Sequence, residues 1–175
     1  MDRLSPIPAA RFYAHGLNLH PSKVEVYTDG ACWNNRKADA RCRGGIWFSP
    51  NHQKNAAIRV PGERQSNQVG ELAAAIKAIS SVPSFTPLVI ITDSKYVING
   101  LTTHLREWED DGWIGIENAQ LFKRAAYLLR RRTATTSFKW VKGHDGNLGN
   151  EESDKLAKEG ANKEAIDYLD MDVPL

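Results

Sequence analysis

Two aspartates follow segments of the chain that read as strands. Residues 24–30 carry β-branched and aromatic residues at a period of two and reach a glycine, a pattern typical of a strand that runs into a loop, and Asp29 stands at its end. Residues 88–92 form a continuous apolar run, as in a strand buried on both faces, and Asp93 comes next. Ligands of open α/β sheets bind just beyond the carboxyl ends of the strands. Two carboxylates held there repel each other unless a cation lies between them, and a divalent metal ion is the simplest candidate.

Two further acids lie on segments that read as helices and share a face with small apolar residues. Glu71 has alanines three, four and seven positions later, and Asp154 has alanines three and seven positions later. One acid at a strand end or helix start is usually structural, but four acids at inward or sheet-end positions favour a shared metal site. Carboxylates without a histidine and cysteine cluster suit Mg²⁺ or Mn²⁺ better than zinc. Two such ions about 4 Å apart would hold a phosphodiester for in-line attack by water.

A histidine in a glycine-rich loop is the remaining candidate for proton transfer. His144 lies between Gly143 and Gly146. A single loop histidine is usually solvated surface, but near a metal-bound phosphate it could move protons or assist product release.

The elements that must position these side chains follow from periodicity and turn signals. We expect a three-stranded antiparallel meander at 24–29, 46–49 and 56–60, with a long loop at 30–43, and further strands at 88–92 and 136–141. We expect helices at 67–81, 94–105 and 120–131 and a last helix capped by Asn150 with Glu151 and Glu152 in its first turn, while 108–118 reads as irregular. The order β-β-β-α-β-α-α-β-α predicts an α/β fold with a mixed sheet, antiparallel on one side and parallel on the other, with helices packed on it.

Length and composition indicate one globular domain. The 175 residues suffice for a single α/β core, and 41% hydrophobic with 25% charged residues is typical of a folded chain. The net charge of +2 allows a nucleic-acid partner without requiring one. No apolar run approaches the length of a membrane span, and the N-terminus lacks the apolar core of a secretory signal. Cys32 and Cys42 could form a disulfide, but we expect two free thiols inside a cell, in the nucleus, cytoplasm or a mitochondrion.

Four motifs, in order and spacing, resemble type 1 ribonuclease H, most of all its eukaryotic form. They are T-D-G-A-C at 28–32, S-N-Q-x-x-E-L-x-A at 66–74, T-D-S-x-Y-V-I-N-G at 92–100 and W-V-K-G-H-x-G-x-x-G-N-E-x-x-D-x-L-A at 140–157. The resemblance covers residues 23–163 as a catalytic domain, with 1–22 as an N-terminal arm or linker and 164–175 as an acidic tail. It implies a ribonuclease H-like fold with a mixed five-stranded sheet, three strands antiparallel and two parallel, and helices on both faces.

The same resemblance implies an endonuclease that cleaves the RNA strand of an RNA–DNA hybrid and leaves 3′-hydroxyl and 5′-phosphate ends. Two Mg²⁺ ions, with Mn²⁺ as an alternative, would be held by Asp29, Glu71, Asp93 and Asp154, and His144 would be the mobile loop histidine. We expect a monomer, which could be a module of a longer polypeptide.

Substrate contacts also follow from the resemblance. Asn35, Asn67 and Gln68 correspond to the amides that read the minor groove and the RNA 2′-hydroxyls. Arg64, Ser66 and Asn118 match a pocket for a DNA-strand phosphate, with Ser66 where Thr is usual. Tyr96 and Trp108 resemble the aromatics of the DNA-strand channel, although aromatics at helical spacing often belong to the core.

The chain departs from the family where a basic handle normally touches the duplex. His104 stands where a Trp is usual, and residues 107–111 carry four acids and no Lys. These changes favour weak hybrid binding and leave the chemistry unaffected.

Two other functions fit parts of the pattern. A catalytically silent binding module on this fold is one, although all four acids and His144 are present. The other is a different metal nuclease of the same fold, such as an integrase or resolvase. Those enzymes lack the G-H-x-G loop followed by N-E-x-x-D that this chain carries, so this alternative fits the sequence less well.

Overall fold

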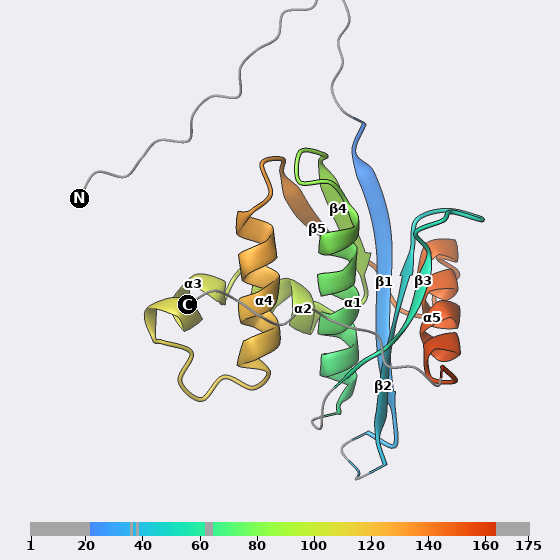
Figure 1. Ribbon diagram of the computed structural model, residues 1–175, viewed down its shortest axis with the longest axis horizontal. Coiled ribbons are helices and arrows are strands. Elements are labelled where there is room, and N and C mark those ends of the chain that lie inside the picture. The colour runs from blue at the N-terminus through green and yellow to red at the C-terminus, as the bar shows by residue number, and fades with distance from the viewer. Residues whose placement is uncertain (1–21, 36, 38, 62–64, 164–175) are drawn as a thin grey trace, which may run out of the picture.

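A single mixed sheet of five strands forms the centre of the molecule (Figure 1). The computed structural model describes residues 22–35, 37, 39–61 and 65–163. The strands are β1 (Val24–Trp33), β2 (Arg41–Trp47), β3 (Ala56–Arg59), β4 (Leu88–Thr92) and β5 (Thr136–Trp140). They lie in the order β3-β2-β1-β4-β5, with β1–β2 and β2–β3 antiparallel and β1–β4 and β4–β5 parallel. The predicted mixed sheet is confirmed.

Helices cover both faces of this sheet. They are α1 (Asn67–Ser81), α2 (Lys95–Leu101), α3 (Leu105–Asp110), α4 (Ala119–Arg130) and α5 (Leu148–Gly160). Side chains of neighbouring strand residues point to opposite faces. A Cβ on Gly44 would meet Ala74 of α1, whereas a Cβ on Gly45 would meet Ser153 of α5, so α1 and α5 pack on opposite faces. Helix α4 lies beside α1, as Figure 1 shows.

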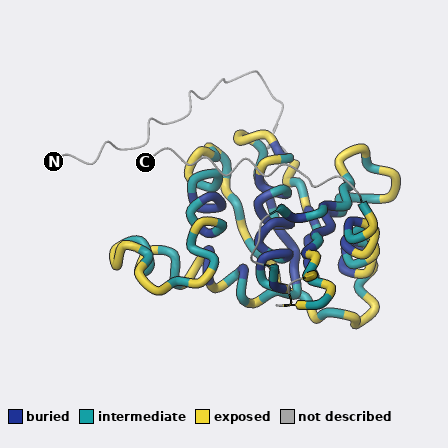
Figure 2. The backbone as a smooth tube through the Cα atoms, turned by 60° about the horizontal axis from the view of Figure 1, so that its bottom comes forward, coloured by how far each residue is buried: buried dark blue, intermediate teal, exposed yellow. Residues whose placement is uncertain are grey.

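The core lies between the sheet and these helices, where Figure 2 shows the buried stretches gathered. Aliphatic side chains of β1, β2 and β4, among them Val26, Ile46 and Ile90, are 0% exposed. Helix α1 contributes an alanine-rich inner face, and Phe122 of α4 is also fully buried. Small residues on α1 let the helix lie close to the sheet, and this closeness brings Glu71, which α1 carries, near the strands.

Two helices and three strands have the bounds that periodicity predicted, or bounds within one residue of them; β3 ends one residue before the expected 56–60. Helix α1 and strand β4 coincide with the expected 67–81 and 88–92, and α4 and β5 differ from expectation by a single residue at one or both ends. Ser66 starts α1, since its hydroxyl accepts a hydrogen bond from the Val69 amide at 3.4 Å.

The β1–β2 hairpin is longer than expected. Strand β1 continues to Trp33, and β2 begins at Arg41, so half of the predicted loop 30–43 is paired strand and Gly44-Gly45 lies inside β2. The polar residues of this segment suggested a loop, but an antiparallel ribbon can carry them on its exposed face.

Two helix boundaries also differ from prediction. The expected helix 94–105 ends at Leu101, where the Thr102 hydroxyl donates to the Ile98 carbonyl at 2.6 Å. Helix α3 then starts at Leu105, the last residue of that expected helix, and runs into the segment 108–118 expected to be irregular. Asn147, not Asn150, caps α5 and accepts from the Asn150 amide at 3.1 Å. Helix α5 therefore starts earlier than expected, with Glu151 but not Glu152 in its first turn.

The proposed arm 1–22, except for residue 22, and the tail 164–175 lie outside the described residues. Within the described part of the chain, no helix is long and apolar enough to cross a membrane.

Replacing Gly45 by Ala tests the contact between β2 and α5. The new Cβ would lie 2.0 Å from the Ser153 carbonyl oxygen, a main-chain atom that cannot swing away. We expect Gly45→Ala to lower the free energy of unfolding by about 3 kcal/mol or more, measured by urea denaturation.

The neighbouring Gly44→Ala is the matched control, since its Cβ would meet the Ala74 Cβ at 3.1 Å. Its cost should be about 1 kcal/mol or less. Equal losses for the two variants would contradict this packing.

Candidate active site

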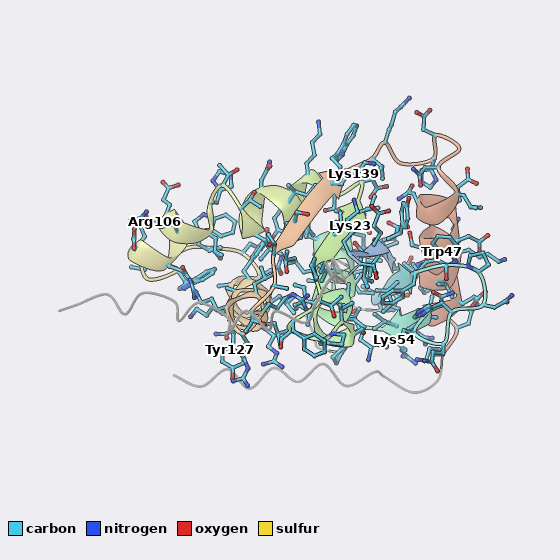
Figure 3. The ribbon with its side chains drawn as sticks, turned by 90° about the horizontal axis from the view of Figure 1, so that it is seen from above. Lys23, Trp47, Lys54, Arg106, Tyr127 and Lys139 are labelled. Carbon is cyan, nitrogen blue, oxygen red and sulfur yellow. The ribbon has the colours of Figure 1, made fainter. Side chains whose placement is uncertain are left out.

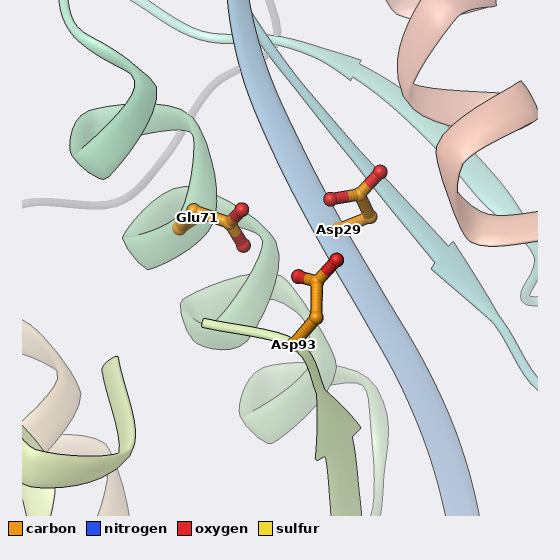
Figure 4. Close-up of side chains that lie close together, drawn as sticks. All are labelled: Asp29, Glu71 and Asp93. Atoms are coloured by element: carbon orange, nitrogen blue, oxygen red, sulfur yellow. The ribbon is translucent and has the colours of Figure 1, made fainter. Parts of the chain in front are cut away.

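Three of the predicted acids converge where the parallel pairing of β1 and β4 ends, although Asp29 lies within β1 rather than at its end, because β1 continues to Trp33 along β2. Asp29 comes from β1, Glu71 from α1 and Asp93 from the residue that follows β4, and each offers an oxygen within 4.8 Å of the others. Figure 4 shows the carboxyl groups of Asp93 and Glu71 turned toward Asp29. The sequence argument that Asp29 and Asp93 lie side by side is confirmed, and Glu71 joins them.

Strand register and glycine packing bring these acids together. Thr28 pairs with Thr92 in the parallel β1–β4 ladder, so the next residue on each strand is an aspartate. Gly30 and Gly70 then let α1 touch β1: a Cβ on Gly30 would lie 2.2 Å from the Glu71 amide nitrogen, and one on Gly70 would lie 2.9 Å from the Ala31 amide nitrogen of β1. Larger residues at these positions would push Glu71 away from the strand ends.

Burial and mutual repulsion disfavour the charged forms of two of these acids. Burial, followed by repulsion from Asp93 and Asp154, raises the pKa of Asp29 to about 7. Burial, with repulsion from Asp29 and Asp93, raises the pKa of Glu71 well above its ordinary value. The Gly30 amide opposes part of this effect, since it donates to Asp29 Oδ1 at 2.9 Å. A bound cation would compensate the repulsion.

Asp154 lies beside this cluster rather than inside it. It is close enough to Asp29 to raise the pKa of that carboxyl by charge and by hydrogen bonding, yet it is not one of the three acids whose oxygens meet within 4.8 Å. Its side chain is 16% exposed and forms an ion pair with Lys158, one turn later on α5. Asp154 therefore adds to the repulsion on Asp29 from outside the group of three.

The donor set fits a hard divalent cation. Glu71 Oε2 is buried and has no hydrogen-bond partner among the described residues, which is costly for a carboxylate oxygen. A metal ion would supply the missing interaction. Carboxylate oxygens without histidine or cysteine are the ligands that Mg²⁺ and Mn²⁺ prefer.

The loop after β5 packs directly onto Asp93. The Trp140 indole Nε1 donates to the Asp93 carbonyl at 3.0 Å, and a Cβ on Gly143 would lie 2.3 Å from Asp93 Oδ2. His144 follows in the left-handed region, with a φ of 54°, and is exposed. Trp140 and Gly143 were not singled out from the sequence as supports of Asp93, although both belong to the motif that contains His144.

The predicted minor-groove amides gather at the start of α1. The Asn67 amide donates to Asn35 Oδ1 at 3.3 Å, and the Cys32 amide donates to Asn67 Oδ1 at 2.8 Å. Gln68 Oε1 has no hydrogen-bond partner among the described residues. Asn67 thus has a structural anchor on β1, and Gln68 retains an unused acceptor.

The two cysteines next to these amides are direct cross-strand neighbours. Cys32 and Cys42 are partners in the β1–β2 register, and both are free, as expected. The Cys42 thiol is buried and donates to the Ser66 carbonyl at 3.0 Å, which ties β2 to the start of α1.

Two of the predicted phosphate-binding residues stand at the starts of two helices that pack on each other. Ser66 caps α1, while Asn118 starts α4 and donates to the Tyr96 hydroxyl at 3.0 Å. Arg64, the third predicted phosphate ligand, lies outside the described residues.

The aromatic candidates build a cluster around Phe122. The rings of Tyr96 and Trp108 lie 5.3 and 4.9 Å from that ring, and His104 stacks on Trp108 at 5.4 Å. Tyr96 and Trp108 therefore support the core, and their role in a DNA channel stays a prediction.

The acidic segment on α3 is partly neutralised by the protein itself. Glu109 forms an ion pair with Arg130 of α4, and Asp110 lies 4.0 Å from Arg106. Arg106 is at the end of the molecule away from Trp47, as Figure 3 shows. Glu109 thus anchors α3 to α4 through Arg130. The sequence shows Glu109 only as one of a run of acids and does not indicate this structural role.

Asp29→Asn should stabilise the metal-free protein at high pH. A carboxyl whose folded pKa is near 7 and whose ordinary value is 3.8 binds more protons folded than unfolded between these values, so stability falls as pH rises through that interval. The amide retains the oxygen that accepts from Gly30. In EDTA at pH 8 we expect the substitution to raise the free energy of unfolding by roughly 2–4 kcal/mol, and the gain should disappear near pH 4.

The control is Asp110→Asn, an exposed acid paired with Arg106. A pH-independent or absent gain for Asp29→Asn in thermal melts would show that the carboxylates are not strained by one another.

Comparisons with known proteins agree with this geometry. The RNase H family model matches residues 21–162. The chain is 40% identical over 143 residues to human ribonuclease H1, covering 79% of this chain and 50% of that protein, so it spans about half the length of that relative. It is 33% identical over 151 residues to ribonuclease H of Erwinia tasmaniensis, covering 83% of this chain and 93% of that protein.

A solved structure has the same arrangement of elements. The crystal structure of LC9-RNase H1, a type 1 RNase H with the type 2 active-site motif, superposes with a TM-score of 0.63 at 26% identity, over 79% of this chain and 71% of that one. Motifs, sheet order, acid cluster and relatives agree, and the chain belongs to the type 1 ribonuclease H family.

Proposed function

We propose that this chain is a metal-dependent endonuclease that hydrolyses the RNA strand of RNA–DNA hybrids. The observation that carries the proposal is the convergence of Asp29, Glu71 and Asp93, from three separate elements, in a chain of this family. A structural role does not explain three carboxylates that repel one another at the sheet end where ligands bind.

Asp29, Glu71, Asp93 and Asp154 would hold two Mg²⁺ ions. The ions would supply an activated water and stabilise the charge on the phosphate oxygens, so that the cut leaves 3′-hydroxyl and 5′-phosphate ends. Mn²⁺ has the same preference for oxygen ligands and would serve as an alternative.

The chain's own residues would orient the substrate and move protons. Trp140 and Gly143 keep Asp93 in place, because one bonds its carbonyl and the other leaves room for its carboxylate. His144, exposed in the loop above Asp93, would carry a proton to or from the reacting phosphate.

Selection of RNA over DNA would depend on the amides at the start of α1. The 2′-hydroxyl both donates and accepts hydrogen bonds and is the group that separates RNA from DNA. Asn67 and Gln68, with Asn35 beside them, lie on the turn of α1 that precedes Glu71, so they are close to the cluster. Gln68 Oε1 is buried and has no partner among the described residues, so the amide would turn outward to bond a 2′-hydroxyl.

The DNA strand would be held by a second surface. Ser66 and Asn118, together with Arg64, would bind a phosphate, and Tyr96 and Trp108 would contact the sugar and base beside it. We further propose that the enzyme acts as a monomer in a reducing compartment, where the Cys32 and Cys42 thiols stay free.

Asp93→Asn should abolish cleavage without unfolding the protein. The substitution removes one ligand charge and leaves the main-chain carbonyl that Trp140 bonds. With labelled RNA–DNA hybrid and Mg²⁺ we expect the rate to fall by about 10²–10³-fold or more.

The matched control is Asp145→Asn, in the loop after β5 that packs on Asp93 but paired with Lys142 on the surface. It should cleave hybrid at the rate of the wild type. Wild-type protein should leave duplex DNA and duplex RNA intact, and cleavage of either at the rate of the hybrid would overturn the proposal.

Gln68→Ala should weaken hybrid recognition selectively. This side chain offers an acceptor that the protein leaves unused, whereas Asn67→Ala would also remove the anchor to Cys32. One lost hydrogen bond is worth about 1 kcal/mol, so kcat/KM for hybrid should fall about fivefold or more. The Mg²⁺-induced rise in melting temperature should not change. Unaltered kcat/KM would show that Gln68 does not touch the RNA strand.

A further inference from the structure

Asp154 differs from the other acids of the cluster in its immediate surroundings. Glu71 has a buried oxygen without a partner among the described residues, whereas Asp154 forms an ion pair with Lys158 on the same helix. The spacing of four residues, with the acid on the N-terminal side, is the favourable arrangement for such a pair on a helix.

The two members of the pair face different environments. The Asp154 side chain is 16% exposed and lies next to Asp29, whereas the Lys158 side chain is 59% exposed and can swing into solvent. The ammonium therefore reaches the edge of the acid cluster from outside. It places a positive charge where a cation would otherwise bind.

We propose that Lys158 is a positioning residue that holds Asp154 in the metal-free protein and competes with a divalent cation for that carboxylate. The proposal rests on the proposed function, because it assigns Asp154 to a metal site. Lys158 would thereby set how much divalent metal is needed to fill the Asp154 side of the site.

The strengths of the interactions make this exchange feasible. A pair with one largely exposed partner contributes little to stability and is screened by salt, so it yields readily to a competing ion. A doubly charged ion that contacts both Asp154 and Asp29 would replace the single attraction between Lys158 and Asp154 by attractions to two carboxylates. Lysine suits this role because its compact charge sits on a flexible stem, whereas an arginine would grip the carboxylate with two parallel hydrogen bonds.

The test is a titration of the free protein with MgCl₂, with no nucleic acid present and the ionic strength held constant. Lys158→Met keeps a similar stem and removes the charge. We expect the Mg²⁺ concentration at half-maximal rise of the melting temperature to fall about threefold to tenfold, because the Asp154 carboxylate is no longer occupied by an ammonium and is open to the ion.

The matched control is Lys155→Met. Lys155 lies on the same helix, is 66% exposed and pairs with Glu152 at 3.9 Å, so the variant has the same net charge and loses a similar pair. Its Mg²⁺ midpoint should equal that of the wild type, and an equal fall in both variants would mean that only net charge matters and would overturn the proposal.

A second background isolates Asp154. In Asp154→Asn protein, Lys158→Met should no longer change the midpoint, because the carboxylate for which the two cations compete is absent. A midpoint for Lys158→Met equal to that of the wild type, or an effect that persists in Asp154→Asn, would overturn the proposal. Neither result bears on hybrid cleavage by the wild-type protein, which is measured separately and tests the proposed function.

Discussion

The close approach of α1 to β1 is the constraint on which the site depends. Gly30 and Gly70 leave no side chain between the helix and the strand, so the Glu71 main chain lies against the sheet where Asp29 emerges. The parallel register of β1 and β4 adds Asp93 from the other side. Neither contact stabilises the acids themselves, since burial and repulsion raise the pKa of Asp29 and of Glu71. The packed core holds together groups that would otherwise separate.

The acid cluster is only partly neutralised by the protein's own groups. Lys158 reaches Asp154 at its edge, and Glu71 Oε2 remains without a hydrogen-bond donor among the described residues. A fully paired cluster would be more stable without metal, but it would leave no oxygen for an ion to bind. The partial pairing is consistent with a site whose missing charge comes from solution.

Several residues that resemble substrate contacts also hold the structure together. Tyr96 and Trp108 pack on Phe122, and Asn67 accepts from the Cys32 amide. If a mutation at one of these positions lowered activity, the loss would combine weaker substrate binding with lower stability of the fold. Gln68, with an acceptor that the described part of the protein does not use, is the position where recognition can be measured apart from folding.

The sequence by itself determined the mixed sheet, the span of α1 and the proximity of Asp29 and Asp93 on neighbouring central strands, because periodicity and strand order are local signals. Tertiary structure decided what depends on distant partners. Residues 30–33 became strand because 41–44 pair with them, and Glu109 acquired Arg130 from another helix. Asp154 was expected beside the other acids and lies at their edge, because its orientation depends on the packing of α5 on the sheet and on Lys158. Such contacts depend on residues that are far apart in the chain, or on alternative partners for the same side chain. A local sequence pattern does not show which partner is bound in the folded protein.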